Sequence, residues 1–146
     1  MKTQTSNGIL LDVNNIEVVY NDIVQVLRGV SLSVAEGAIV KDSIIMDNTE
    51  IGRNSVIDRC ILDKEVIIGS NSQIGYGDDY RINRLNAKVL NTGLTIIGKR
   101  TIIPADYKIG RNCIIYDNTL ESDLPESEIE SGETIKPRRR RNRINA

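Results

Sequence analysis

The chain has 146 residues and a formal net charge of −1, so its length fits one domain or a short solenoid. The nearly balanced charge gives no strong attraction to nucleic acid or to a membrane surface. No His, Phe or Trp is present, and the apolar residues are mainly Ile and Val, which favour strands. We find no signal-peptide pattern and no apolar run long enough for a membrane helix. The two cysteines, Cys60 and Cys113, fit a reducing compartment, so we expect a cytoplasmic protein.

Residues 1–37 contain two apolar stretches separated by the polar turn Tyr20-Asn21-Asp22. In the second stretch Val30, Leu32 and Val34 alternate with serines, which is typical of a half-buried strand. The pattern predicts an antiparallel β-hairpin, a structure that is marginally stable alone. We expect this hairpin to cover the exposed first coil of the structure that follows.

Residues 38–136 carry a repeat in which an aliphatic residue recurs every five or six positions. A small residue often follows three or four positions later, and Gly or Asp often follows the aliphatic residue directly, where it would allow a bend. Three such units make one coil of a triangular prism, with strands stacked about 4.8 Å apart. The fold class predicted is therefore all-β, a left-handed parallel β-helix of about four coils. Its inward-facing ladder is predicted to consist of Val40, Met46, Ile51, Ile57, Leu62, Ile68, Ile74, Ile97, Ile103, Ile109 and Ile115.

The repeat is interrupted and then fades. Residues 76–94 are polar and charged, and we expect a loop that projects from a corner of the prism, either as a functional element or as a tolerated insertion. Weak spacing at Leu124, Ile129 and Ile135 suggests a degraded final coil. Residues 137–146 form a basic tail that we expect to be disordered, and nucleic acid is not an expected partner because no aromatic residue is interleaved with the arginines.

No constellation of catalytic residues is apparent. Without His, neither a His-dependent acyltransferase site nor a His-ligated zinc site can form. Cys60 and Cys113 occupy the small-residue position of the repeat, which favours a structural role. A phosphate-binding loop is absent, and adjacent acids such as Asp78 and Asp79 lack the spacing of a metal site. We therefore expect no catalytic residue, no metal and no cofactor.

The segment AIVKDSIIMDNTEIGRNSVIDRCILDKEVIIGSNSQIGYGDD, together with LNTGLTIIGK and KIGRNCIIY, resembles bacterial glucose-1-phosphate adenylyltransferase (ADP-glucose pyrophosphorylase). The resemblance covers the C-terminal β-helix of that family, about a hundred residues. The family's catalytic work lies in an N-terminal nucleotidyltransferase domain with a Gly-rich nucleotide loop, which this sequence lacks. The resemblance therefore implies the regulatory and tetramer-forming module of glycogen biosynthesis, and no catalytic residue can be carried over.

Residues 10–37, LLDVNNIEVVYNDIVQVLRGVSLSVAEG, resemble the start of an ABC-transporter ATPase of the branched-chain amino-acid importer type. In that family an aromatic residue between the first two strands stacks on adenine, and Tyr20 matches its position. The phosphate loop, glutamine loop and LSGGQ signature are absent. Stacking alone would contribute about 1–3 kcal/mol, too little for useful affinity for ATP. The two resemblances meet near Glu36-Gly37 and suggest a fusion, natural or constructed.

Two functions from different classes remain. The first is a non-catalytic β-helix scaffold that forms a homo-oligomer or docks on an ADP-glucose pyrophosphorylase subunit. The second is a fusion remnant with weak or no ATP binding through Tyr20, or a product with no selected function. A hexapeptide acyltransferase is disfavoured because the sequence has no His.

Overall fold

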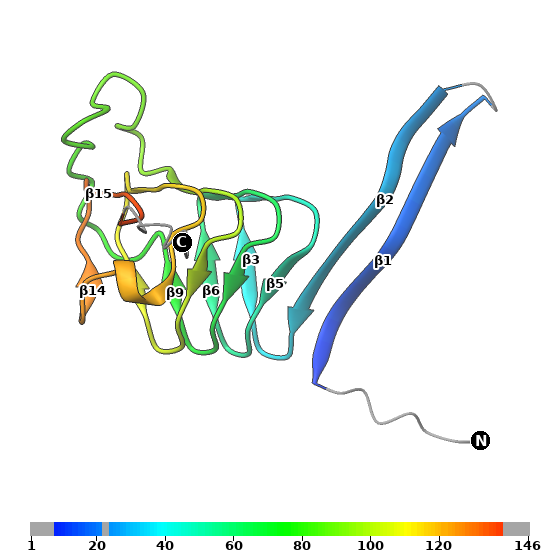
Figure 1. Ribbon diagram of the computed structural model, residues 1–146, viewed down its shortest axis with the longest axis horizontal. Helices are drawn as coiled ribbons and strands as arrows, with labels where there is room; N and C mark the ends of the chain where they lie inside the picture. Colours follow the sequence, from blue (N-terminus) through cyan, green and yellow to red (C-terminus); the bar gives the residue numbers. More distant parts are fainter. Residues whose placement is uncertain (1–7, 22–23, 139–146) are drawn as a thin grey trace, which may run out of the picture.

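The computed structural model describes residues 8–21 and 24–138, and Figure 1 shows a prism of stacked coils from which a long hairpin projects. Three sheets of five strands each form the structure. Sheet A contains β1 (Ile9–Tyr20), β2 (Val24–Ala35), β5 (Thr49–Ile51), β8 (Ile67–Ile68) and β11 (Ile102–Ile103). Sheet B contains β3 (Ile39–Lys41), β6 (Val56–Asp58), β9 (Gln73–Ile74), β12 (Lys108–Ile109) and β14 (Glu128–Ile129). Sheet C contains β4 (Ile44–Ile45), β7 (Cys60–Leu62), β10 (Thr95–Ile97), β13 (Ile114–Ile115) and β15 (Thr134–Ile135).

All strand pairs of the prism are parallel, and only β1 and β2 pair antiparallel. The predicted fold class, an all-β, left-handed parallel β-helix with an N-terminal antiparallel hairpin, is confirmed. Strands of only two or three residues suffice because each pairs with the coil before and the coil after, so stability accumulates along the axis. The extra strands β14 and β15, at Ile129 and Ile135, extend the β-helix one level beyond the four coils expected from the regular repeat.

One column of aliphatic side chains from each sheet fills the prism. The columns are Val34, Ile51, Ile68 and Ile103 in sheet A; Val40, Ile57, Ile74, Ile109 and Ile129 in sheet B; and Ile45, Leu62, Ile97, Ile115 and Ile135 in sheet C. Met46 does not belong to a column, because Ile45 is the residue paired with Leu62 and the Met46 side chain is 36% exposed. The sequence Ile44-Ile45-Met46 offers three apolar residues, so spacing alone could not choose between them.

Small polar residues sit beside the aliphatic columns and satisfy backbone carbonyls within the prism. Ser55 Oγ donates to the carbonyl of Gly69 at 2.8 Å, and Thr95 Oγ1 donates to the carbonyl of Gly110 at 2.8 Å. Both side chains are fully buried, so these bonds remove a desolvation cost that an unpaired hydroxyl would carry. The small position of the repeat is therefore selected for size and for hydrogen bonding.

Most glycines that follow an aliphatic residue are not the residues that bend the chain. The left-handed backbone is instead adopted one residue before the small position, for example at Asn54 (φ 56°) and Asn71 (φ 60°). At Gly52 a Cβ atom would lie 2.6 Å from the backbone nitrogen of Ser70 in the next coil. The expectation that Gly allows the bend is wrong at Gly52, where Gly lets successive coils approach closely.

The hairpin covers one of the three sides of the first coil. The end of β2, from Leu32 to Val34, pairs with Thr49–Ile51 of β5, and β1 pairs with β2 alone. Beyond this contact the two strands leave the prism as a free ribbon (Figure 1). Among the described residues, β3 and β4 have a neighbouring strand on one side only. The expectation that the hairpin covers the first coil therefore holds for sheet A alone, and the edges of β3 and β4 are not covered by it.

At the opposite end of the prism, the connection between β13 and β14 packs against the core. The 3-10 helix η1 (Glu121–Asp123) lies in the connection after β13, and Leu124, directly after it, is only 8% exposed. Tyr107, also buried, donates its hydroxyl hydrogen to the carbonyl of Pro125 at 2.7 Å. Most of the predicted basic tail, residues 139–146, lies outside the described residues. The described part contains no helix that could span a membrane.

Candidate functional site

Tyr20, the only predicted ligand-binding residue, is the last residue of β1, at the far end of the projecting hairpin. Its side chain is 66% exposed. The residues that follow it, 22–23, lie outside the described part of the chain. The structure brings no other predicted site residue near Tyr20, because the predicted ladder lies in the prism.

The densest polar arrangement lies at the base of the loop between β9 and β10, where residues 76–94 meet the last coils. Arg111, which follows β12, donates from Nη2 to Asp58 at 2.8 Å and from Nε to the carbonyl of Gly77 at 2.6 Å. Its guanidinium carbon lies 5.0 Å from the centre of the Tyr80 ring, a cation–π contact. The residue is only 8% exposed, so the guanidinium joins the loop to the prism in a largely dry place.

The charge of Asp58 is stabilised by this contact. The hydrogen bond from Arg111 lowers the pKa of Asp58, and the charge of that guanidinium adds to the effect, while burial opposes it. Arg111 Nη1 is buried and has no hydrogen-bond partner among the described residues. The pair therefore holds two opposite charges at a fixed geometry between loop and prism.

Asn83, inside the loop, is fully buried and connects the loop to the last coil. Its Nδ2 donates to the carbonyls of Asn112 at 2.9 Å and Glu133 at 3.2 Å. Its Oδ1 accepts from the backbone N–H of Leu85 at 3.0 Å and of Asn86 at 2.9 Å. A single amide thus satisfies backbone groups of both the loop and the coils.

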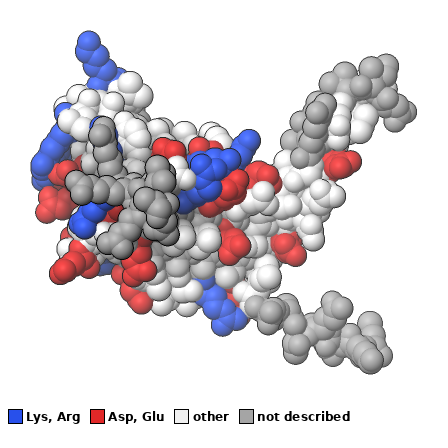
Figure 2. Space-filling view, in the orientation of Figure 1, with Lys and Arg blue, Asp and Glu red and all other residues white. Residues whose placement is uncertain are grey.

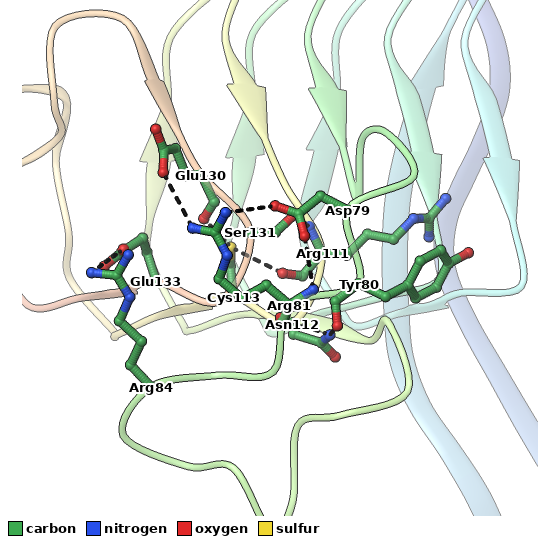
Figure 3. Close-up of polar contacts among 10 residues, drawn as sticks. All are labelled: Asp79, Tyr80, Arg81, Arg84, Arg111, Asn112, Cys113, Glu130, Ser131 and Glu133. Atoms are coloured by element: carbon green, nitrogen blue, oxygen red, sulfur yellow. Dashed lines mark hydrogen bonds and ion pairs between the residues drawn. The ribbon is translucent and has the colours of Figure 1, made fainter.

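Asn112, also fully buried, makes the reciprocal connection. Its Oδ1 accepts from the N–H of Gly93 at 2.7 Å, and its Nδ2 donates to the carbonyls of Tyr80 and Arg81 at 3.1 Å each. Asn112 thereby holds the two ends of the loop at one corner of the prism. Figure 3 shows its side chain beside Tyr80 and Arg81. A loop with so many satisfied backbone groups is an ordered element of the fold.

Ion pairs surround this hydrogen-bonded base. Arg81 lies between Asp79 at 3.4 Å and Glu130 at 3.6 Å, and Arg84 contacts Glu133 at 2.9 Å (Figure 3). Each pair has at least one partner that is substantially exposed, so each contributes about 1 kcal/mol or less. Their effect is to orient the loop, whereas the buried amides fix it.

A cavity of about 310 Å³ lies between the start of the loop and β14. Carboxylates of Asp78, Asp79, Glu128 and Glu130 are among its lining residues. Within the described residues, however, no group of three or more His, Cys, Asp or Glu is placed to hold a metal ion. The lining of the cavity is acidic.

The two cysteines are poor nucleophiles. Both are fully buried, and burial raises the pKa of Cys60 to about 12 and that of Cys113 to about 11. Cys60 Sγ donates to the carbonyl of Asp58 at 3.2 Å, and Cys113 Sγ to that of Glu130 at 3.1 Å. Protonated, hydrogen-bonded thiols at these positions pack the prism and would not react readily.

Sequence reasoning did not single out Asn83, Arg111 or Asn112. Arg111 and Asn112 occupy a corner of a repeat unit, where polar residues are usually solvated. Asn83 is one of several asparagines in a polar loop. The signal that could have found them is indirect: a long insertion that returns to the same repeat must satisfy its backbone groups, and Asn and Arg do so with few side chains.

Residues 13–97 match the family described as GlmU-like, C-terminal hexapeptide. The chain belongs to this family. It is 45% identical over 97 residues to a glucose-1-phosphate adenylyltransferase of Thermomicrobium roseum, a match that covers 66% of this chain and 23% of that protein. The protein of the same name from Acetivibrio thermocellus is 33% identical over 102 residues, covering 70% of this chain and 24% of the relative. The chain thus spans about a quarter of the length of these relatives.

Among solved structures, serine acetyltransferase isoform 3 from Entamoeba histolytica is similar in fold, with a TM-score of 0.53 and 12% sequence identity. The alignment covers 79% of this chain and 38% of the acetyltransferase chain. At that identity the likeness concerns the fold alone. The hexapeptide β-helix is common to both proteins.

Proposed function

We propose that the chain is a non-catalytic β-helix scaffold of the ADP-glucose pyrophosphorylase type, which acts in the cytoplasm by forming a homo-oligomer or by docking on a catalytic subunit. The observation that carries the proposal is the 45% identity to a glucose-1-phosphate adenylyltransferase over 97 residues of a protein about four times longer. The likeness is far higher than the 12% identity at which the fold alone is shared.

The chemistry of the described residues supports a scaffold. Burial raises the pKa values of both cysteines, and the sequence has no His to act as a general base. The loop is joined to the prism by hydrogen bonds of Arg111, Asn83 and Asn112. These buried polar residues thus fix the position of the loop on the surface of the prism, and a scaffold requires a surface of fixed shape.

Size-exclusion chromatography with light scattering tests the proposal. We expect a mass of at least twice the 16.3 kDa of one chain, or co-elution with the full-length glucose-1-phosphate adenylyltransferase of Thermomicrobium roseum. Serine acetyltransferase isoform 3 from Entamoeba histolytica, which shares the fold at 12% identity, is the matched control and should not co-elute. A strict monomer that ignores the adenylyltransferase would remove the scaffold function.

A remnant ABC-type nucleotide site at Tyr20 is the second candidate, favoured by the 66% exposure of that side chain, which leaves the ring free to stack. Equilibrium dialysis with ATP separates the two functions. The scaffold predicts no binding at millimolar nucleotide. Binding that the substitution Tyr20→Ala abolishes would establish the nucleotide site instead.

A further inference from the structure

Exposed apolar side chains are concentrated at the N-terminal end of the molecule. More than half of the large apolar residues that are exposed in the described part belong to the hairpin or to the first coil: Ile9, Leu10, Leu11, Ile16, Val18, Val19, Tyr20, Ile39, Val40, Ile44 and Met46. On the face shown in Figure 2, charged side chains gather over the β-helix and are sparse on the described part of the hairpin. Such a concentration of exposed apolar side chains at one end of a molecule is typical of an interaction site.

One part of this surface is the open end of the prism, which we call the N-terminal mouth (Leu11, Ile39, Val40 and Ile44). Val40 stacks on Ile57 in the interior column of sheet B, yet Val40 is 40% exposed while Ile57 is fully buried. Leu11 is paired with Val34 of the sheet A column and is 50% exposed. Val40, an interior position, is therefore open to solvent because no described strand covers β3. Ile39 and Ile44 alternate with the inward-facing Val40 and Ile45, so they form the outer rim of the mouth.

The other part is the distal hairpin, residues 14–20 of β1 with the strand paired to them. At about 3.3 Å per residue these residues extend roughly 20 Å beyond the contact of β2 with β5. Val18 and Val19 are 38% and 52% exposed, and adjacent strand residues point to opposite faces. Each face of β1 in this ribbon therefore carries an exposed apolar side chain, although a two-stranded ribbon needs packing on at least one face to be stable.

We propose that two copies of the chain associate around a two-fold axis, so that the distal hairpin of each lies across the N-terminal mouth of the other. The proposal deepens the scaffold function and rests on it. The occupant is a second copy because hairpin and mouth lie at the same end of one molecule (Figure 1). A two-fold arrangement then covers both surfaces in two identical contacts, with a closed symmetry. The ribbon also supplies strands, the kind of element that the edges of β3 and β4 can pair with.

Single lysine substitutions test the two surfaces separately. Val19→Lys changes the hairpin and Ile39→Lys changes the mouth, and both positions are more than half exposed, so each variant should fold. The matched control is Ile102→Lys, a 39% exposed position on the outer face of sheet A, away from both surfaces. Light scattering and analytical ultracentrifugation should give a dimer for the unmodified chain and for Ile102→Lys. Each of the other two variants should raise the dimer dissociation constant about tenfold or more.

Mixing the two weakened variants tests the reciprocity. In the mixed dimer, the intact hairpin of Ile39→Lys meets the intact mouth of Val19→Lys, so one of the two contacts is restored. A lysine in an apolar contact is enough to break that contact, so each homodimer keeps no intact contact whereas the mixed dimer keeps one. The mixture should therefore dimerise more tightly than either variant alone. An interface formed by like surfaces, hairpin on hairpin or mouth on mouth, would give no such recovery.

The outcomes separate this inference from the scaffold function. A monomeric chain that still co-elutes with the adenylyltransferase keeps the scaffold and overturns the reciprocal dimer. The reciprocal dimer is also overturned if Val19→Lys or Ile39→Lys leaves the dimer dissociation constant unchanged. It is overturned equally if Ile102→Lys raises that constant as much as they do, or if mixing the two variants gives no recovery. Circular dichroism of each variant confirms that the β-helix is folded in all arms.

Discussion

The loop of residues 76–94 and the hairpin of β1 and β2 both leave the β-helix, and they are held in opposite ways. The loop has no strand between β9 and β10, yet buried amides of Asn83 and Asn112 satisfy its backbone and attach it to the last coils. The hairpin pairs two strands of 12 residues each, with several register shifts along its length, yet most of it packs on no other part of the described chain. Strand pairing along a ribbon and attachment of that ribbon to a fold are thus separate properties.

The difference has a physical cause. A loop is fixed when its buried polar groups are paired, because leaving one unpaired costs about 1–3 kcal/mol. A ribbon is fixed when its apolar faces are covered, and those of the hairpin are not. The loop therefore belongs to the folded monomer, whereas the distal hairpin depends on a partner.

The largest effect is expected in the prism core. Ile57→Ala should lower the free energy of unfolding by about 2–5 kcal/mol, because it leaves a cavity among fully buried neighbours. The same change at Ile16 of the hairpin, a 42% exposed position, should cost less than about 0.5 kcal/mol in dilute samples where the chain is monomeric. Urea denaturation measures both. Equal losses would mean that the hairpin is part of the cooperative unit.

The loop base should come next. Asn83→Ala should cost about 3 kcal/mol, because the carbonyls of Asn112 and Glu133 and the N–H groups of Leu85 and Asn86 lose their partner. Asn91→Ala in the same loop is the matched control, since exposed Asn91 bonds only the carbonyl of Ala87 and should change stability by less than about 0.5 kcal/mol. If both variants melt at the temperature of the parent chain, the loop is not anchored as described.

A smaller effect depends on pH. Arg111 lowers the pKa of Asp58 below its ordinary value of 3.8, so the stability this contact adds is fully present above 3.8. It is lost as the pH falls through the lowered pKa. Asp58→Asn should be less stable than the parent chain at neutral pH by about 1–2 kcal/mol, and this gap should narrow below 3.8. Thermal melting across this range measures the gap, and a gap that stays constant with pH would contradict the prediction.

The sequence predicted the β-helix because aliphatic residues spaced five or six apart share no single face of an α-helix, whereas they stack in columns in a three-sided coil. It could not choose Ile45 over Met46, since three successive residues are apolar. The sequence did not predict the candidate site, for a different reason. The repeat pattern predicts that Arg111 and Asn112 lie at a solvated corner. They are buried because the loop folds back onto them, and the repeat pattern does not predict that contact. The hairpin was predicted as a pair of strands, but alternation along a strand does not tell what covers its faces.

The smallest expected effect concerns the corner where sheets C and A meet. Asn48, Glu65, Arg100 and Asn118 stack there with left-handed φ angles between 56° and 61°. Asn adopts this conformation more readily than Glu because its short side chain can bond locally. Glu65→Asn should therefore raise the free energy of unfolding by about 0.5 kcal/mol, even after the exposed ion pair between Glu65 and Lys99 is lost.

Glu50→Asn is the matched control for this change, because Glu50 is exposed in the middle of β5, where the backbone is extended and Asn is disfavoured. That variant should melt at a lower temperature than the parent chain, and Glu65→Asn at a higher one, in parallel calorimetric scans. Opposite shifts from one substitution would establish that backbone conformation decides the identity of corner residues. Shifts of the same sign would assign the effect to the lost carboxylate charge instead.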